Sequence, residues 1–330
     1  MEIVKFGGSS FATAATIKLC GEIVKSSRNH KVIVVSAPGK YGTYTTKVTD
    51  ELIKVAQGEK PLGEIMTRFD TTANKLLSPT KYSIFQAELT QTAEAITRNP
   101  QDYNFIVSRG EYLAAKLFAL YLDYHFIDAA DILVINDDAT VDLEATRQQI
   151  IKHKLKKHLP LVIGGFYGQK NGATALFSRG GSDYTGAILA ALLSATLYKN
   201  YTDTNGIQTA DPHLVTDTRT IPCLDFDSLD ILTHNGAGVI HENVANLLKT
   251  YRVPLRVDNT FNPNQSYTEV HSLKCRNCQL NFFCVTHKDN KILVLSKKNG
   301  SPVAVQIINS TPETITQDLQ KIHLDLSQAL

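Results

Sequence analysis

The stretch IVKFGGSSFATAATI, residues 3–17, runs from a short apolar strand through two glycines into a helix-like segment. Glycine lets the backbone approach a bound group closely, and the N–H groups at the start of a helix attract anions. Lys5 adds a compact positive charge of the kind that binds phosphate. The lysine precedes Gly7 and Gly8, which excludes the P-loop pattern. Taken alone, the stretch is either a phosphate-binding turn or a plain connection between a strand and a helix.

The composition limits the classes of protein to which the chain can belong. Its 330 residues are 43% hydrophobic and 20% charged, with 34 Lys and Arg against 32 Asp and Glu. This charge balance gives no support to a nucleic-acid or membrane-surface partner. No apolar run approaches the ~20 residues of a membrane helix, and the start lacks a signal-peptide pattern. The five cysteines do not resemble a disulfide framework, so we expect a reduced, cytoplasmic protein.

Strand-like and helix-like segments alternate along most of the chain, which predicts a layered α/β fold with a mainly parallel sheet. A composition shift after Glu269 introduces three cysteines, two strand-like runs and a terminal helix, so we place domains at 1–270 and 271–330. Besides the opening stretch, strands are expected within 31–37, 159–168, 197–207, 253–261, 281–288 and 291–298. Helices are expected within 12–26, 49–98, 111–122, 183–195 and 311–326.

A second glycine pair occurs in FSRGGSDYTG, residues 177–186. Arg179 offers a bidentate fork for a carboxylate or phosphate, and Gly180 and Gly181 again precede a helix. One explanation of Asp183 is purely structural. Near the start of that helix its negative charge would stabilise the first turn by about 0.5–2 kcal/mol. The combination with Arg179 and Ser182 exceeds what a cap requires, which favours a binding site.

Two further stretches carry polar residues at expected element boundaries. VSRGEYLAAKL, residues 107–117, places Arg109 and Glu111 at a loop-to-helix junction. Glu111 there is either a site residue or a first-turn glutamate facing solvent. YTDTNGIQTADP, residues 201–212, is either a turn-rich loop or a set of donors and acceptors for ribose or adenine.

Seven stretches in order carry a family resemblance: VKFGGSS, VVSAPGK with TKVTD, VSRGEYLAA, FSRGGSDYTGA, YTDTNGIQTADP, NGAGVIHENV and LRVDNTFNP. Over residues 1–270 the chain resembles an aspartokinase of the amino-acid kinase superfamily. The resemblance implies a three-layer αβα sandwich with a mainly parallel central sheet, followed by a small α+β, partially ACT-like unit. It also implies ATP-dependent phosphorylation of the side-chain carboxylate of L-aspartate, a first step toward lysine, threonine, methionine and diaminopimelate.

The resemblance assigns roles to residues that match the family's motifs. The catalytic residues are Lys5 and Asp183, and the phosphates lie against Lys5, Gly7, Gly8, Ser9, Gly180 and Gly181. The amino-acid substrate is bound by Thr49, Glu111, Arg179 and Ser182. The nucleotide is bound by Thr202, Asp203, Gln208, Asp211, Pro212, His213 and Gly238. The implied cofactors are ATP and Mg²⁺, with the metal on ATP oxygens rather than on protein ligands, and the implied assembly is a homodimer.

Three positions depart from the family's pattern, and all three lie on the nucleotide side. Gly238 stands where many members have a lysine near the ATP phosphates, His213 replaces an arginine, and Gln208 replaces a tyrosine. Losing a contact made only in the transition state costs about 10²–10³ in rate. We therefore hypothesise that Lys40 or Lys47, in the loop after the second strand, supplies the missing cation.

The tail differs from the family more strongly. Residues 275–330 are long enough for one small ACT-like unit, so we expect no paired feedback site and no inhibition by lysine or threonine. Cys275, Cys278 and Cys284 lack a second well-spaced pair, which makes a zinc site a minor alternative. His241 is interpreted as structural.

Two alternatives to an aspartate kinase remain open from the residues. One is a kinase for another small amino-acid carboxylate, such as glutamate. The other is a non-catalytic, amino-acid-binding regulatory paralogue, which the three departures and the short tail favour. Retention of Lys5, Gly7, Gly8 and Asp183 argues against a non-catalytic protein.

Overall fold

The computed structural model describes residues 1–177, 180–236, 240–263, 265–271, 282–288, 291–298 and 303–329. Its contacts divide the chain into two compact units, Met1–Asp203 and Thr204–Leu330. Each unit is described by itself below.

The first unit is built on a parallel sheet with the strand order β3-β4-β2-β1-β7. Its strands are β1 (Glu2–Phe6), β2 (His30–Val35), β3 (His125–Ile127), β4 (Leu161–Gly164) and β7 (Leu197–Thr202). β1 lies between β2 and β7, with Lys5 opposite Val34 on one side and Asn200 on the other. The apolar run around Lys5 forms a central strand because both faces of this sheet are covered by helices.

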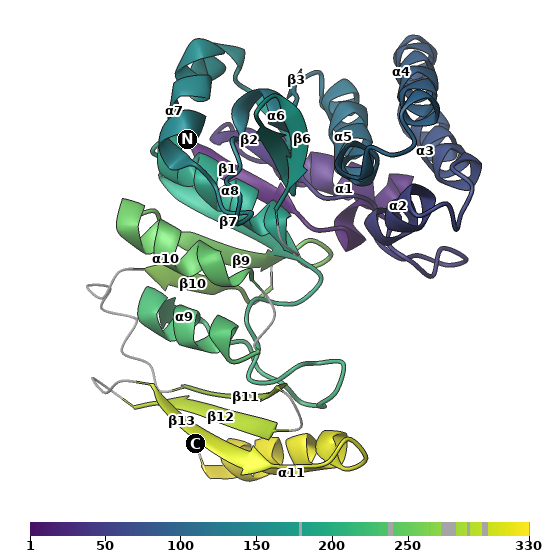
Figure 1. The fold of residues 1–330 in the computed structure, drawn as a ribbon. Coiled ribbons are helices and arrows are strands. Elements are labelled where there is room, and N and C mark those ends of the chain that lie inside the picture. The colour runs from purple at the N-terminus through teal and green to yellow at the C-terminus, as the bar shows by residue number, and fades with distance from the viewer. Residues whose placement is uncertain are drawn as a thin grey trace. The chain divides into compact units, whose positions relative to one another are not determined.

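Helices cover the two faces of this sheet, as Figure 1 shows for α1 to α5 on one side and α7 and α8 on the other. Val4, Phe6, Ile33 and Val35 share one hydrophobic cluster with α1 to α5. Since side chains alternate along a strand, Lys5 points to the opposite face, where α8 lies. The helices are α1 (Ala14–Lys25), α2 (Val48–Ala56), α3 (Gly63–Leu76), α4 (Pro79–Arg98), α5 (Tyr103–Leu122), α6 (Ala129–Ile132), α7 (Leu143–Lys152), α8 (Gly181–Leu192) and the 3₁₀ turns η1 (Ser9–Phe11) and η2 (Leu155–His158).

Two of these helices show how local sequence sets their ends. Thr13 and Thr16 form reciprocal hydrogen bonds that cap α1. Asp102 accepts a hydrogen bond from the amide of Phe105, so α5 begins at Tyr103. The expected start at Glu111 is therefore wrong: Arg109 and Glu111 lie inside α5 rather than at a loop-to-helix junction.

The stretch 159–168, expected as one buried strand, forms two strands in different sheets. After β4, Phe166 adopts a left-handed backbone conformation with φ of 75° and redirects the chain. The next strand, β5 (Tyr167–Lys170), pairs antiparallel with β6 (Ala173–Leu176). The expectation of a single strand was wrong because the apolar residues on both sides of Gly164 and Gly165 were taken as one run, whereas the chain turns at Phe166 directly after these glycines.

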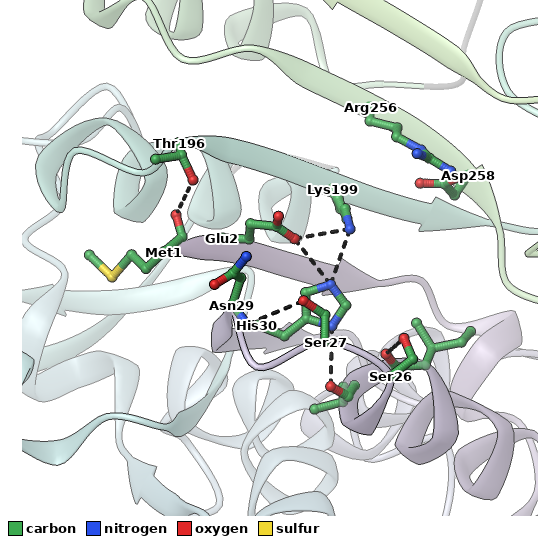
Figure 2. A network of polar contacts seen from close by, with 12 residues as sticks. Met1, Glu2, Ser26, Ser27, Asn29, His30, Thr196, Lys199, Arg256 and Asp258 are labelled. Atoms are coloured by element: carbon green, nitrogen blue, oxygen red, sulfur yellow. Dashed lines mark hydrogen bonds and ion pairs between the residues drawn. The ribbon is translucent and has the colours of Figure 1, made fainter.

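The amino-terminal ends of β1, β2 and β7 carry a buried polar network, shown in Figure 2. The carboxylate of Glu2 lies 3.2 Å from Nε2 of His30 and 2.9 Å from the ammonium of Lys199. Nδ1 of His30 lies 3.2 Å from the carbonyl oxygen of Val24, which assigns the proton to Nδ1 in the neutral ring. This network lies at the opposite end of β1 from Gly7.

The second unit contains two sheets and three helices within its described residues. β10 (Thr268–His271) pairs antiparallel with β9 (Leu255–Asn259) and parallel with β8 (Cys223–Asp225). β11 (Phe282–Lys288), β12 (Lys291–Lys297) and β13 (Ala304–Asn309) form an antiparallel sheet. The helices are α9 (Phe226–His234), α10 (Glu242–Tyr251) and α11 (Ile315–Ala329). Sequence reasoning missed β13.

One hydrophobic cluster joins the tail to an earlier segment of the same unit. Ala210 and Val215 pack with Phe283 and Val285 of β11 and with Leu319 of α11. The compact units therefore divide the chain after Asp203, whereas the division into 1–270 and 271–330 stays a prediction about domains.

The predicted α/β fold with a mainly parallel sheet and a small α+β tail is confirmed. Cys20 and Cys284 are free thiols.

Candidate functional site

Lys5 and Asp183 form a buried ion pair between β1 and the first turn of α8. Lys5 is 7% exposed. Asp183 also accepts a hydrogen bond from Nδ2 of Asn200 at 3.1 Å, and its backbone carbonyl accepts one from the hydroxyl of Tyr198 at 3.0 Å. Asp183 thus holds the Lys5 ammonium beside Gly7, where a Cβ would lie 3.8 Å from Nζ. Sequence reasoning missed Asn200, a fully buried polar residue within β7.

Gly7 and Gly8 have different physical reasons for being glycine. A Cβ on Gly8 would lie 2.9 Å from the carbonyl oxygen of Ala37, so the protein's own packing excludes a side chain. A Cβ on Gly7 would meet only ordinary contacts, the nearest at 3.6 Å. The amide of Gly7 donates to the carbonyl of Tyr201 at 3.2 Å and is already used. The amides of Gly8 and Ser9 are therefore the better candidates for anion binding.

The amino terminus of α8 begins at the second glycine pair. Gly180 precedes the helix with φ of 82°, a left-handed conformation that favours glycine. The Cβ of a residue replacing Gly181 would lie 2.7 Å from Cβ of Phe177. The helix start therefore carries no side chain at Gly180 or Gly181, and its positive end is accessible to an anion. Arg179, which precedes it, lies outside the described residues.

Glu111 is a buried carboxylate with one oxygen unused. Its Oε1 accepts a hydrogen bond from the hydroxyl of Thr49 at 3.1 Å, while Oε2 is buried and has no hydrogen-bond partner among the described residues. Burial raises the pKa of Glu111, and the positive charge of Lys47 partly opposes this effect. Glu111 is 1% exposed, so Oε2 is suited to a substrate ammonium and not to bulk water.

Two glycines at the end of β4 bring Glu111 and Ser182 to the same place. A Cβ on Gly164 would lie 3.0 Å from the carbonyl oxygen of Glu111, and one on Gly165 would lie 2.6 Å from Cβ of Ser182. Helices α5 and α8 therefore both approach this strand end closely. Gly165 also donates its amide to the carbonyl of Val35 at 2.9 Å.

These contacts close a ring at the carboxyl ends of β1, β2 and β4. Lys5 pairs with Asp183, and Asp183 adjoins Ser182. Ser182 lies close to Gly165, and the preceding Gly164 lies close to the backbone of Glu111. Glu111 binds Thr49 at the start of α2, and the residue before that helix, Lys47, lies against Gly8. In open α/β sheets, ligands bind at this edge. The first unit thus brings together the predicted residues Lys5, Gly7, Gly8, Ser9, Thr49, Glu111, Gly180, Gly181, Ser182 and Asp183.

Arg109 does not join this ring. Its guanidinium lies over the rings of Phe105 and Tyr112, at 4.2 and 4.3 Å, and donates to the hydroxyl of Ser108. It is a buried packing residue on another face of α5.

The predicted nucleotide residues fall into both units. Thr202 ends β7, and Asp203 follows it in the first unit. In the second unit Gln208 donates to the hydroxyl of Thr220 at 3.1 Å, and Asp211 accepts from the amide of His213 at 2.9 Å. Asp211, Pro212 and His213 are exposed. Gly238 lies outside the described residues, so the nucleotide wall stays a prediction.

The described ranges contain neither a cluster of metal-ligating side chains nor a membrane-spanning helix. No group of three or more His, Cys, Asp and Glu side chains there is placed to hold a metal ion. Cys275 and Cys278, named in the zinc alternative, lie outside those ranges, and Cys284 is a buried thiol. No described helix is long and apolar enough to cross a membrane.

Comparison with known proteins gives a consistent set of relatives. The model of the amino acid kinase family matches residues 1–259. The chain is 33% identical over 291 residues to aspartokinase 3 of Bacillus subtilis, covering 82% of this chain and 64% of that protein. It is 29% identical over 286 residues to an aspartokinase of Chlamydia pneumoniae, covering 82% and 63%. The chain thus spans a little less than two thirds of the length of these relatives.

Solved structures show the same likeness. Aspartate kinase of Clostridium acetobutylicum superposes with a TM-score of 0.72 at 29% identity, over 86% of this chain and 66% of that one. E. coli aspartokinase III, solved with aspartate and ADP, superposes with a TM-score of 0.76 at 24% identity, over 97% and 82%. At 24% identity, the likeness to E. coli aspartokinase III shows a shared fold and nothing further.

Proposed function

Since the match over residues 1–259 makes this chain a member of the amino acid kinase family, we propose that it transfers the γ-phosphoryl group of ATP to the side-chain carboxylate of L-aspartate. The observation that carries the proposal is the closed ring of contacts in the first unit. It holds a buried carboxylate with a vacant oxygen on one side and a glycine pair with a buried lysine on the other. An α-amino acid and a phosphate chain are the ligands that these two sides fit.

On the amino-acid side, Glu111 accepts the α-ammonium group at its vacant Oε2, while Thr49 keeps Oε1 oriented. Ser182 adds a hydroxyl close to the end of β4. Arg179 precedes the glycines of α8 in sequence, and its guanidinium suits the α-carboxylate.

On the phosphate side, Lys5 neutralises charge on the transferring group, and Asp183 holds the ammonium in place. A side-chain oxygen of aspartate attacks the γ-phosphorus, and the bond to the bridging oxygen breaks. The bonding electron pair stays on that oxygen, which becomes a terminal oxygen of ADP. The products are an acyl phosphate and ADP, and no proton has to move. The protein's contribution is positioning and charge neutralisation.

Mg²⁺ bound to the triphosphate would supply further charge neutralisation. It prefers phosphate oxygens and water over a cage of protein ligands. Among the described residues, the carboxylate that pairs with Lys5 is that of Asp183, which is also hydrogen-bonded to Asn200. That donor set fits a metal carried by the nucleotide. We further propose that Thr202, Asp203, Gln208, Asp211, Pro212, His213 and Gly238 bind the nucleotide, that the active protein is a homodimer, and that it works in the cytoplasm.

The test is release of ADP from ATP–Mg²⁺ with a panel of amino acids and the Lys5→Ala variant. Turnover with L-aspartate that Lys5→Ala abolishes, in a variant that still unfolds cooperatively above the assay temperature, supports the proposal. Turnover only with another acid, such as glutamate, would identify that acid, and not L-aspartate, as the substrate. No turnover with any acid, despite measurable aspartate binding, indicates a regulatory paralogue. Activity that survives in Lys5→Ala contradicts the role of Lys5.

A further inference from the structure

Lys47 lies against Gly8 of the glycine pair, whereas Lys5 lies beside Gly7. A Cβ on Gly8 would lie 3.3 Å from Cε of Lys47, while a Cβ on Gly7 would lie 3.8 Å from Nζ of Lys5. The two lysines reach the same turn from different parts of the chain. Lys5 belongs to β1, and Lys47 directly precedes α2. Two cations therefore flank Gly7 and Gly8.

The two lysines differ in their counter-ions. Lys5 already pairs with Asp183. Lys47 is half-buried and forms no ion pair with any carboxylate in the part of the chain that the structure describes. A partly desolvated ammonium with no described carboxylate within 4.0 Å is suited to an anionic ligand.

The loop that carries Lys47 is fixed at its beginning. Nη2 of Arg68 in α3 donates to the carbonyl of Gly39, and the Arg68 guanidinium lies 4.3 Å from the ring centre of Tyr44. The amide of Gly39 donates to the carbonyl of Gly8 at 2.7 Å. The loop and the glycine turn are therefore one connected backbone unit.

The loop is also fixed at its end, next to Lys47. The hydroxyl of Thr46 donates to Oε1 of the buried Glu51 at 3.0 Å. The amide of Val48 donates to the carbonyl of Pro38 at 3.0 Å. The residues on both sides of Lys47 are thus fixed by hydrogen bonds. Lys40, in the same loop, is exposed.

We propose that Lys47 is a second phosphate-binding cation, which contacts the phosphate chain across Gly7 and Gly8 from Lys5. This inference rests on the proposed function for the identity of the phosphate donor and selects Lys47 over Lys40. The competing role for Lys47 is to neutralise Glu111. The ammonium of Lys47 and the carboxylate of Glu111 form no ion pair, so the distance between them exceeds 4.0 Å.

The test is calorimetric titration of inorganic tripolyphosphate, which needs no turnover. Lys47→Ala is expected to weaken binding roughly 10- to 100-fold, the range for a hydrogen bond to a charged group, and Lys47→Arg to restore most of it. Lys54→Ala, on the exposed face of α2, is the matched control and is expected to bind as the parent protein does. Lys40→Ala is expected to change binding by less than about twofold. Thermal unfolding of each variant controls for folding.

Steady-state kinetics separate the two roles of Lys47. Lys47→Ala is expected to raise the KM for ATP or lower kcat, with the KM for the amino acid nearly unchanged. A change confined to the KM for the amino acid, unaltered tripolyphosphate binding, or an effect at Lys40 in place of Lys47 overturns the inference. Tripolyphosphate binding that depends on Lys47 in a protein without turnover upholds it and contradicts the proposed kinase activity.

Discussion

Gly7 and Gly8 are identical in sequence, yet their surroundings predict opposite responses to alanine. Gly8→Ala places a methyl group 2.9 Å from the carbonyl oxygen of Ala37 and is expected to lower stability by about 1–3 kcal/mol. Gly7→Ala meets only ordinary contacts and is expected to change stability by less than about 0.5 kcal/mol. Its methyl group faces the proposed phosphate site, so tripolyphosphate binding should weaken roughly 10- to 100-fold. Chemical denaturation and calorimetry measure both effects, and a stable Gly8→Ala would contradict the packing argument.

Glu111 makes amino-acid binding dependent on pH. Burial raises the pKa of its carboxyl group, and only the ionised form attracts an α-ammonium group. Affinity for L-aspartate should therefore fall as the pH drops through this raised pKa. Glu111→Gln should bind roughly 10- to 100-fold more weakly, with a flat profile over that range. Titration calorimetry at several pH values measures this, and an unchanged profile in the variant rules the assignment out.

The same group has the opposite effect on stability. Because the native carboxyl group holds its proton to higher pH than the unfolded one, the native protein loses stability as the pH rises from the ordinary glutamate value to the raised one. Glu111→Gln removes this loss. Burying the ionised carboxylate of Glu111 therefore lowers the stability of the folded protein, while it keeps a negative charge in place for the substrate.

At the scale of elements, β1 connects two polar sites of different kind. Its amino-terminal end lies in the network of Glu2, His30 and Lys199 (Figure 2). Burial lowers the pKa of His30, with Lys199 acting in the same direction and Glu2 against it. Protonation of the unfolded chain below about pH 6.5 therefore destabilises the fold, by up to about 1.4 kcal/mol per pH unit.

His30→Asn should remove this acid sensitivity while keeping a donor toward the carbonyl of Val24. Unfolding free energies between pH 7 and 5 for both proteins measure the difference. Equal slopes would show that His30 is not responsible. Turnover at neutral pH should be unchanged, since His30 lies at the opposite strand end from Lys5.

Helices and strands were predicted best where the pattern of apolar residues and the position of glycine pairs indicate the same element. β1, β2, α1 and α8 follow apolar runs and glycine pairs, and the structure has them within a few residues of the expected ends. α5 was started too late, because the SRGE stretch looked like a boundary while the cap at Asp102 was overlooked. β13 was missed because its residues are largely exposed and lack a buried face.

At the scale of the whole molecule, the tail shares a core with residues of its own unit that precede the predicted boundary. Ala210 and Val215 pack on β11 and α11. A chain ending at residue 270 should therefore expose these residues and exchange backbone amide hydrogens faster over 209–215 than the full chain. Leu319→Ala should reproduce part of this effect, at a cost of about 2–5 kcal/mol.

Hydrogen exchange followed by mass spectrometry measures this difference. Equal protection of 209–215 in the shortened and full chains would support a separate domain of residues 1–270. Faster exchange would show that the compact unit, not the predicted boundary, governs folding of this region.

The sequence by itself determined the fold class and the chemical types present in the site, because apolar runs, glycine pairs and charged residues at strand ends are local patterns. It also identified Lys5, Glu111 and Asp183 as candidates. Only the tertiary structure decided which donors are already used, as at Gly7, and which acceptor is vacant, as at Glu111. It also distinguished Lys47 from Lys40, since burial and distance arise from contacts between residues that are far apart in the chain. Those contacts convert a list of polar residues into a ring with two lysines beside one glycine turn.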